Sequence, residues 1–495
     1  MTPRLVIAAW LGLALAALFF YPLAVALSTD IYYLQWRTAD VLETTAALAV
    51  LACFFGIIVF WVWPRSTRAS HAVLVLVSAV PLASFAAGVS RQLPFQRTLI
   101  AAGETGALGT IVSLVIATAA AVALLAWPAG FGRVVRRLLL LVSPVSLVVV
   151  ATLALSAART GAAVRIDHEP ADAAAARVCA PVLALLFDEL SFYYVYDQDD
   201  NIRPELSALT RFGSQATHYL SVAAPGRETL DALPSFLAAR RVREIEVRST
   251  GLMERGAESE LLPFDAVRPD GLFGTARALG FWTEVGGYYL AYCDLLSGVV
   301  DVCRSRSFYN VSSPGEFSIA DPMRTTVVLW PRQFPFGLLK HPAFARHQRE
   351  MVEELTAFAR RPIRQVPPTF RFVHFSIPHL PYVFDADGYD PPFDPLMTVP
   401  DDEYAQQVKY VDRLLGELME ELRREGVYDG TTVVVLADHG YRFGGRERDP
   451  LQIPFIVKEA GQQRRAEVRA EREGATLLRD TLAAACGSPA RAAAR

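Results

Sequence analysis

The sequence predicts two parts: an α-helical membrane bundle of five transmembrane helices, followed by an α/β sandwich domain. Two observations lead to this prediction. Apolar residues are concentrated in the first third of the 495-residue chain, which has a positive mean hydropathy of +0.27. In the remainder, short β-branched runs alternate with amphipathic stretches of helical spacing. That alternation is typical of a largely parallel sheet covered by helices.

Five apolar segments in the first part each have about the ~20 residues that are needed to cross a bilayer. They are residues 5–27, 44–63, 71–89, 106–127 and 138–155. A cleaved signal peptide would explain the first segment but not five in succession. We therefore expect a transmembrane domain over residues 1–156, a linker over 157–178, a catalytic domain over 179–487 and a disordered tail over 488–495.

Arginine placement predicts the orientation of these segments. An odd number of spans puts the two chain ends on opposite sides of the membrane. One side receives Arg4, Arg65, Arg68, Arg133, Arg136 and Arg137, and the other receives Arg37, Arg91 and Arg97. Because the cytoplasmic side carries the excess of Lys and Arg, the first set is expected there and the large C-terminal domain outside the cytoplasm. The net charge of −3 predicts no strong attraction to nucleic acid.

Cysteine spacing fits such a location. Cys293 and Cys303 are close in sequence and either pair outside the cytoplasm or remain two free thiols, with pairing favoured. Cys179 and Cys486 are expected to stand apart.

The C-terminal domain is expected to contain five strands and five helices in the main. The expected strands are 182–187, 281–285, 370–376, 432–437 and 453–457. The expected helices are 204–212, 230–239, 271–279, 404–424 and 476–485. The clearest is 404–424, where apolar residues recur at the spacing of one helix face.

The most informative motif is Asp438-His439-Gly440, which directly follows the β-branched run 432–437. In open α/β sheets ligands bind at the ends of strands. A carboxylate beside an imidazole at that place is half of a site for a divalent metal. The alternative is a solvated turn.

Three further groups stand at comparable positions. Asp188, with Glu189 beside it, ends the strand 182–187, Thr229 opens a helix, and His379 follows the strand 370–376. Each has a plain structural alternative: a turn for Asp188, a helix N-cap for Thr229 and a surface loop for His379. His374, inside its strand, is expected to be a packed histidine.

The order of these elements resembles the sulfatase-like branch of the alkaline phosphatase superfamily. The matching segments are Leu186-Phe187-Asp188-Glu189, Glu228-Thr229-Leu230-Asp231, Ile377-Pro378-His379-Leu380-Pro381, and Asp438-His439-Gly440 followed by the proline-led strand Ile453-Pro454-Phe455. The resemblance covers roughly residues 179–487 and implies an α/β sulfatase-like fold. It further implies a divalent metal ion held by Asp188, Thr229, Asp438 and His439, with Thr229 as nucleophile and His379 as substrate contact or proton donor.

The membrane segments narrow the resemblance to bacterial lipoteichoic acid synthases and phosphoethanolamine transferases. These enzymes transfer a phosphorylated head group from a lipid to a surface acceptor through a threonine. The resemblance therefore implies a phospholipid donor, a cell-envelope acceptor and a place in the bacterial inner membrane. Hydrolysis of a sulfate or phosphate ester at the same site is the alternative, and a catalytically inactive membrane scaffold is a third reading.

Departures from the family pattern bear on the site. Many sulfatases form their nucleophile from Cys or Ser in a Cys-x-Pro-x-Arg motif, but the similar stretch here, 223–227, begins with alanine. Alanine has no nucleophilic atom, so Thr229 is preferred.

The stretch 446–452 contains no histidine, which favours one metal ion over two. Zn²⁺ or Mn²⁺ suits a site of Asp and His ligands, whereas Mg²⁺ or Ca²⁺ would suit an all-oxygen site. Arg446 and Arg448 either bind phosphate or lie in a solvated loop.

Overall fold

The computed structural model describes ten stretches of the chain. They are residues 2–29, 38–90, 128–160, 179–248, 251–256, 259–306, 317–333, 340–389, 401–442 and 451–487. The expected span 106–127, most of the expected linker, the tail 488–495, and the loop with Arg446 and Arg448 lie outside them.

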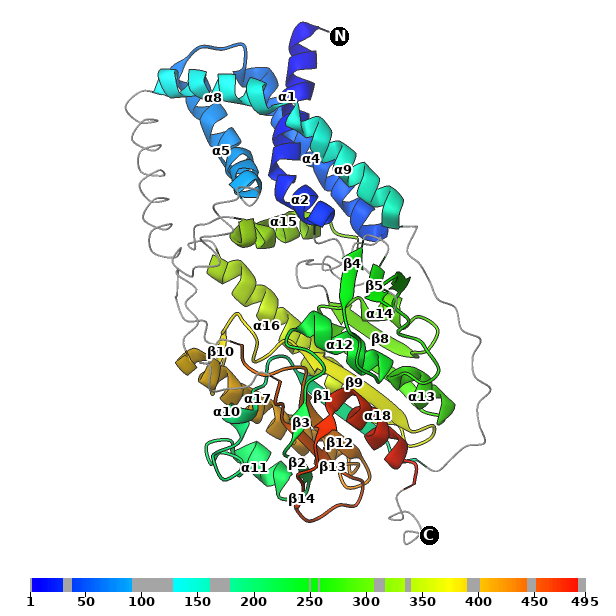
Figure 1. Ribbon diagram of the computed structural model, residues 1–495. Helices are drawn as coiled ribbons and strands as arrows, with labels where there is room; N and C mark the ends of the chain where they lie inside the picture. The colour runs from blue at the N-terminus through cyan, green and yellow to red at the C-terminus, as the bar shows by residue number, and fades with distance from the viewer. Residues whose placement is uncertain are drawn as a thin grey trace. The chain divides into compact units, whose positions relative to one another are not determined.

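The chain divides into two compact units, and the first contains the N-terminal helices (Figure 1). These helices are α1 (Pro3–Phe19), α2 (Tyr21–Thr29), α4 (Thr38–Val62), α5 (Arg68–Ser90), α8 (Pro128–Val142) and α9 (Val145–Thr160). Close packing of α1 on α4 depends on Gly12, where a Cβ atom would lie 2.5 Å from the carbonyl oxygen of Ala52. Small residues permit such an approach between apolar helices.

The prediction of five transmembrane helices is not confirmed. In the described residues two helices, within α4 and α5, are long and apolar enough to cross a membrane. The number rises to four if α1 with α2, bent by 55°, and α8 with α9, bent by 45°, each count as one span. The bends have a local cause, because Pro22 and Pro144 follow the ends of α1 and α8 and cannot continue the backbone ladder of a helix.

The second unit is built on an eight-stranded mixed sheet of order β14-β2-β13-β12-β1-β9-β7-β8. Its strands are β1 (Val182–Phe187), β2 (Thr217–Tyr219), β7 (Trp282–Tyr288), β8 (Val302–Arg306), β9 (Thr369–Phe375), β12 (Thr432–Ala437), β13 (Phe455–Lys458) and β14 (Ala466–Val468). All neighbours pair in parallel except β13, which is antiparallel to β12 and to β2. The expected α/β architecture is therefore present, with one reversed strand inside the sheet.

Helices flank this sheet, and α12, α13 and α18 pack together (Figure 1). The helices are α10 (Phe192–Val195), α11 (Ser207–Gly213), α12 (Thr229–Ala238), α13 (Leu272–Ala278), α14 (Tyr292–Leu295), α16 (Lys340–Ala359), α17 (Asp401–Arg424) and α18 (Gly474–Ala484). The apolar stripe expected on 404–424 is the buried face of α17, which includes Val408, Leu415 and Leu422. Three small sheets complete the unit: β4 (Ile245–Arg248), β5 (Gly251–Arg255) and β6 (Leu261–Pro263); β3 (Val222–Ala223) with β15 (Arg472–Glu473); and β10 (Phe384–Asp385) with β11 (Gly388–Tyr389).

Two disulfide bonds close loops in this unit. The expected pair, Cys293–Cys303, is formed. The expectation that Cys179 and Cys486 stand apart is wrong, since they form the second bond across 307 residues. The backbone explains the pairing: the amide of Ala180 donates to the carbonyl oxygen of Ala485 at 2.9 Å, so the start and end of the domain lie side by side.

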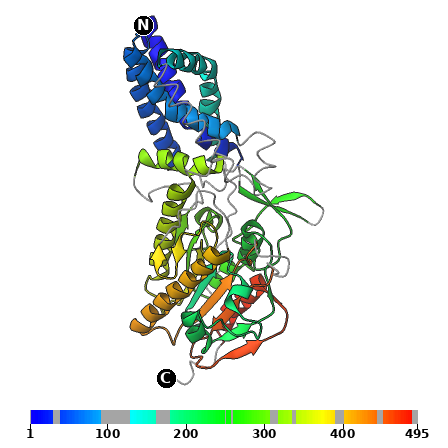
Figure 2. The same cartoon turned by 90° about the vertical axis from the view of Figure 1, so that its left-hand side faces the viewer.

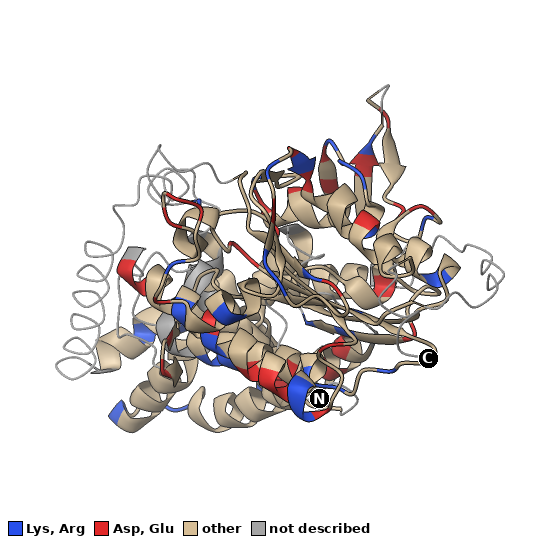
Figure 3. Cartoon of the chain, turned by 90° about the horizontal axis from the view of Figure 1, so that it is seen from below, with Lys and Arg blue, Asp and Glu red and all other residues tan. Residues whose placement is uncertain are grey.

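Acidic and basic residues are interspersed over the second unit (Figure 3). Most of their ion pairs lie at the surface, such as Arg360 with Glu417 at 2.7 Å. Arg371 on β9 and Glu284 on β7 form a buried pair at 2.7 Å, with side chains 0% and 2% exposed. Further carbonyl oxygens accept from the Arg371 guanidinium, so this buried charge is fully bonded.

Candidate metal and nucleophile site

The candidate site lies where β1 and β12 end beside each other. Phe187 pairs with Ala437 in the parallel register, so the next residues, Asp188 and Asp438, are neighbours at one edge of the sheet. Both strands are fully buried because their side chains are apolar on both faces. The first polar residue after each strand therefore lies at the same edge of the sheet, as the sequence predicts.

Asp438 is held by one of its two carboxylate oxygens. Its Oδ1 accepts the backbone amides of Glu189 at 2.9 Å and His439 at 2.8 Å. Its Oδ2 is buried and receives no hydrogen bond from the described residues. A buried carboxylate oxygen without a donor is costly unless a cation is bound. Asp438 thus joins β1 to β12 with one oxygen and offers the other to a ligand.

His439 is oriented by its own backbone. Its Nδ1 donates to the carbonyl oxygen of Gly440 at 2.9 Å, which leaves the lone pair of Nε2 directed to the carboxylates. Nε2 lies 3.5 Å from Asp438 Oδ2 and 3.8 Å from Asp188 Oδ1. The ligand atoms of the three residues all lie within 4.8 Å of one another. This set of two carboxylates and one imidazole fits a divalent metal ion.

Thr229 reaches the same point from α12. Its Oγ1 lies 3.4 Å and 3.5 Å from the carboxylate oxygens of Asp188 and 3.3 Å from His439 Nε2. Thr229 is the first residue of the helix, and Glu228 occupies the N-cap position. The N-cap alternative therefore does not describe Thr229. The backbone turns sharply before it, and Gly226 is required there because a Cβ atom would lie 2.4 Å from the Asp231 side chain.

Ala223, the first residue of the stretch that mimics the Cys-x-Pro-x-Arg motif, lies instead on β3. The structure therefore brings Thr229, Asp188, Asp438 and His439 together.

Glu189 connects this group to a residue that the sequence analysis missed. Its backbone has φ 66°, a left-handed conformation that is unusual for a side chain of this kind. Its Oε1 accepts the backbone amide of Arg442 at 3.1 Å and its guanidinium Nε at 3.0 Å. Arg442 Nη2 in turn donates to His379 Nε2 at 2.9 Å. The network gives Glu189 a role in positioning Arg442 and His379.

His379 is close to the site, but both of its ring nitrogens are engaged. Nδ1 donates to the carbonyl oxygen of Leu380 at 2.8 Å, and Nε2 accepts from Arg442. Burial lowers the pKa of His379, although the carboxylate of Glu189 opposes the shift. The imidazole is therefore neutral in this arrangement. Its role as substrate contact or proton donor stays a prediction.

The buried charges do not balance without a cation. Asp188, Glu189 and Asp438 are 0–1% exposed, and Arg442 is the guanidinium that faces them within the described residues. Three carboxylates against one guanidinium leave two negative charges. Burial, then Asp438, then Glu189 raise the pKa of Asp188 well above its ordinary value. Although burial opposes it, the adjacent His439 and His374 lower the pKa of Asp438 overall. A divalent cation would neutralise the group.

His374 lies one layer deeper, opposite Leu186 in the parallel register. Tyr292 Oη donates to its Nδ1 at 2.9 Å, while its Nε2 is buried and makes no hydrogen bond with the described residues. Burial lowers the pKa of His374 to about 3. His374 is therefore a neutral packed histidine as expected, and because Nδ1 accepts from Tyr292, the ring N–H is on Nε2, beneath the metal-site carboxylates.

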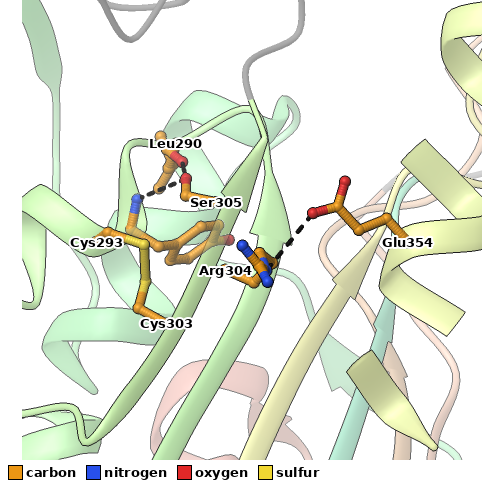
Figure 4. The surroundings of a disulfide bond; sticks show 7 residues. Leu290, Cys293, Cys303, Arg304, Ser305 and Glu354 are labelled. Carbon is orange, nitrogen blue, oxygen red and sulfur yellow. Dashed lines mark hydrogen bonds and ion pairs between the residues drawn. A yellow bond between two sulfur atoms is a disulfide. The ribbon is translucent and has the colours of Figure 1, made fainter. Parts of the chain in front are cut away.

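The disulfide Cys293–Cys303 stiffens the segment that carries Tyr292 (Figure 4). Ser305 Oγ donates to the carbonyl oxygen of Leu290 at 2.9 Å and accepts the backbone amide of Tyr292 at 3.2 Å. Gly287 leaves room for the ring, because a Cβ atom there would lie 2.4 Å from it. Tyr292 thus links this closed loop to His374.

Sequence reasoning missed Arg442, Tyr292 and Tyr404. Tyr404 Oη donates to the carbonyl oxygen of Glu189 at 2.7 Å and accepts the amide of Ser191 at 3.0 Å, which fixes the turn that follows β1. The one signal available for Arg442 was its place two residues after Gly440. Nothing in the sequence marked the two tyrosines, whose partners are 82 and more than 200 positions away.

Comparison with known proteins finds one family match. Residues 276–487 match the sulfatase family, a stretch that includes His379, Asp438 and His439 and begins after Asp188 and Thr229. No curated protein sequence is significantly similar to the chain.

Several solved structures are similar to this chain. A putative sulfatase from Bacteroides thetaiotaomicron is 13% identical, with a TM-score of 0.40 over 63% of this chain and 72% of its own. The phosphonate monoester hydrolase of Agrobacterium radiobacter is 14% identical, with a TM-score of 0.39 over 62% and 74%. The PsFucS1 sulfatase from Pseudoalteromonas sp. is 14% identical, with a TM-score of 0.41 over 63% and 68%. Likenesses at this level carry no argument about activity.

Proposed function

Residues 276–487 match the sulfatase family, and we propose that the chain is a metal-dependent enzyme of phosphate or sulfate esters from the sulfatase-like branch of the alkaline phosphatase superfamily. We further propose that it transfers a phosphorylated head group from a phospholipid to a cell-envelope acceptor through Thr229. The observation that carries the proposal is the meeting of Thr229 Oγ1 with Asp188 and His439 within 3.5 Å.

Asp188, Asp438 and His439 would hold the divalent ion, with Thr229 beside them. Such an ion favours the alkoxide of the threonine and offsets charge on the phosphoryl oxygens. Zn²⁺ or Mn²⁺ is the expected ion for these ligands.

Residues of the chain carry out the bond-forming and proton-transfer steps of the proposed reaction. Thr229 Oγ1 attacks the phosphorus of the donor, and the bond from phosphorus to the diacylglycerol oxygen breaks. Asp188 Oδ1, 3.4 Å from Thr229 Oγ1, is placed to accept the hydroxyl proton. Thr229 begins α12, and the backbone amides at the start of a helix favour a bound anion. The diacylglycerol oxygen takes a proton, and the head group stays on Thr229 as a phosphodiester until an acceptor hydroxyl displaces it.

Arg442 and His379 are the groups proposed to contact the anionic donor. Arg442 keeps 29% of its side chain exposed, whereas its partner Glu189 is fully buried. A guanidinium at the rim of an anionic site binds phosphate or sulfate by paired hydrogen bonds. Proton donation by His379 to the leaving oxygen requires that its contact with Arg442 opens.

A membrane location outside the cytoplasm supports a lipid donor. Two to four helices are long and apolar enough to span a bilayer. The two disulfides of the catalytic unit are typical of proteins outside the cytoplasm. These features support our proposal of a multi-pass protein of the bacterial inner membrane, with its catalytic unit on the extracytoplasmic side.

Hydrolysis is the second candidate, and the family match favours it. If water replaces the acceptor hydroxyl, the same covalent intermediate gives hydrolysis of a phosphate or sulfate ester. The absence of Cys and Ser from the stretch 223–227 separates this site from sulfatases that form a formylglycine, so a threonine ester would be the intermediate in either case.

The test is the mass of the Thr229 peptide after metal-loaded protein is incubated with mixed bacterial phospholipids. A head-group adduct on Thr229 would support transfer, and its mass would identify the donor. An unmodified peptide together with turnover of phosphate or sulfate esters would support hydrolysis. Failure of both would reject an enzymatic role at this site.

Thr229→Ala is the matched variant for this experiment. It removes the hydroxyl and keeps Asp188, Asp438 and His439, so we expect turnover to fall by at least about 1,000-fold, because no nucleophile remains. Metal content should stay near that of the wild type. Wild-type activity in this variant would overturn the assignment of the nucleophile.

A further inference from the structure

Helix α15 (Ala320–Gln333) lies within the sulfatase-family match but belongs to the unit of membrane helices. It packs against α2, α4 and α5, and Figures 1 and 2 show it crossing the ends of these helices. Leu329, fully buried, inserts among Phe20, Leu23 and Ala47. The sequence analysis did not predict this helix.

A hydrogen bond sets the depth of α15 along α4. The backbone amide of Ser318 donates to Glu43 Oε1 at 2.9 Å, and Ser318 Oγ donates to Asp321 at 3.1 Å. The apolar stretch of α4 begins at residue 44, and its ~20 residues span about 30 Å at ~1.5 Å per residue. Glu43 therefore lies at the edge of the hydrocarbon layer, and the start of α15 lies at the same level.

The side of α15 that faces away from the helices is apolar and basic. Val327 is 38% exposed, and Phe317 and Ile319, just before the helix, are 66% and 38% exposed. The side chain of Arg324 is 64% exposed and pairs with Asp321 at 3.5 Å. Asp321, the acidic residue of the helix, is buried. We call Phe317, Ile319, Arg324 and Val327 the outer face of α15. The opposite side, with Val328 and Leu329, is buried in the bundle.

We propose that α15 is an interfacial helix whose outer face contacts the phospholipids of the outer leaflet, at the boundary of head groups and acyl chains. The proposal rests on the membrane placement given above. Three features carry it: the helix crosses the ends of candidate spans, its depth is fixed beside Glu43, and its outer face combines apolar side chains with a cation. This combination is typical of helices that lie in the membrane surface. The stretch that matches the sulfatase family would thus contact the bilayer through α15, in addition to the N-terminal helices.

Site-directed spin labelling of the full-length protein in phosphatidylethanolamine–phosphatidylglycerol vesicles tests the proposal. The label is placed at Val327→Cys in a Cys53→Ala background, since Cys53 is the free cysteine of the described residues. Access of oxygen and of a water-soluble nickel complex to the label then reports its depth. Native Cys53, exposed and midway along the apolar stretch of α4, is the hydrocarbon reference. Val366→Cys, at a position 91% exposed in the catalytic unit, is the aqueous reference.

We expect the oxygen-to-nickel ratio at position 327 to lie between the two references. The neighbour Val328→Cys, 4% exposed, should be shielded from both agents. A ratio at 327 equal to that at 366 would overturn the proposal, and so would shielding as complete as at 328, which would indicate a protein partner. An aqueous ratio at Cys53 would instead reject the membrane placement, and the interfacial assignment with it.

Discussion

Replacing Asp438 by asparagine tests the metal site, because it should raise the stability of the metal-free protein and remove the stabilisation by metal. The asparagine side chain keeps an oxygen for the two backbone amides that Asp438 Oδ1 accepts, so the connection between β1 and β12 survives. Its amide group then takes the place of Oδ2 and turns N–H donors toward Asp188 and His439. A donor repels a cation, so the D438N variant should lose the metal ion.

The expected difference in stability between metal-free D438N and wild type follows from the distance between the two carboxylates. The ligand oxygens of Asp188 and Asp438 lie within 4.8 Å of each other. Two unit charges at that distance repel by about 3 kcal/mol at an effective dielectric constant of ~20. Partial protonation of Asp188, whose pKa is raised, reduces this repulsion. Metal-free D438N should therefore be at least as stable as metal-free wild type, with a gain on the order of 3 kcal/mol where Asp188 is ionised.

With metal the wild type should gain stability and the variant should not. An ion present at ~100 times its dissociation constant stabilises the wild type by about 2.7 kcal/mol and a variant that cannot bind it by nothing. Thermal unfolding of the full chain in chelator and in metal, with metal analysis of both samples, measures the two differences. Asp412→Asn is the control, because Asp412 is also buried and accepts two backbone amides, from Ala208 and Leu209, without being a metal-site residue. Full metal content in D438N, or a loss of stability in chelator like that of the control, would refute the reasoning.

Three further predictions concern residues around the site. Tyr292→Phe removes the donor to His374, and we expect turnover to fall about tenfold with unchanged metal content; an unchanged rate would assign Tyr292 to packing alone. Cys179→Ser opens a 307-residue loop and Cys293→Ser a 10-residue loop. The lost loop-closure entropy predicts that the free energy of unfolding falls by about 6 and about 3 kcal/mol, respectively. Equal unfolding temperatures for the two variants would contradict this ordering. Burial lowers the pKa of Lys458 to about 8, so between pH ~8 and ~10.5 the unfolded chain binds more protons than the folded one. The free energy of unfolding should therefore rise with pH over this range. Lys458→Met should lack this rise, measured as the unfolding temperature.

The strands that carry the site could be predicted closely because their signal is local. β1 and β12 have the predicted bounds, since each is an unbroken apolar run that ends at a carboxylate. A buried parallel strand gives this pattern without help from distant residues. The meeting of Asp188 with Asp438 then follows from the rule that parallel strands end at one edge of a sheet.

Other features depend on contacts that sequence spacing does not reveal. Helix α15 contains Pro322 and Pro331 and buries polar residues such as Thr325, which obscures its helical period. It is stabilised by packing on the N-terminal helices α2, α4 and α5. Arg442 could not be distinguished from a solvated arginine, because its partner Glu189 is 253 positions away. The bends in the first and last apolar segments were missed because composition measures the length of a span and not its straightness.

Arg442 explains why a single divalent ion suits this site. Its guanidinium bonds to Glu189 and to His379, groups that otherwise would be available as ligands. With Arg442 in place, Glu189 is neutralised by a permanent cation, and the charge that remains belongs to Asp188 and Asp438. One divalent ion balances those two carboxylates, whereas a second ion would have to displace a guanidinium from a buried pair, which is costly. The absence of a histidine from 446–452 fits this arrangement. Arg442, 29% exposed, also supplies a fixed positive charge at the rim, where an anionic ester would be bound.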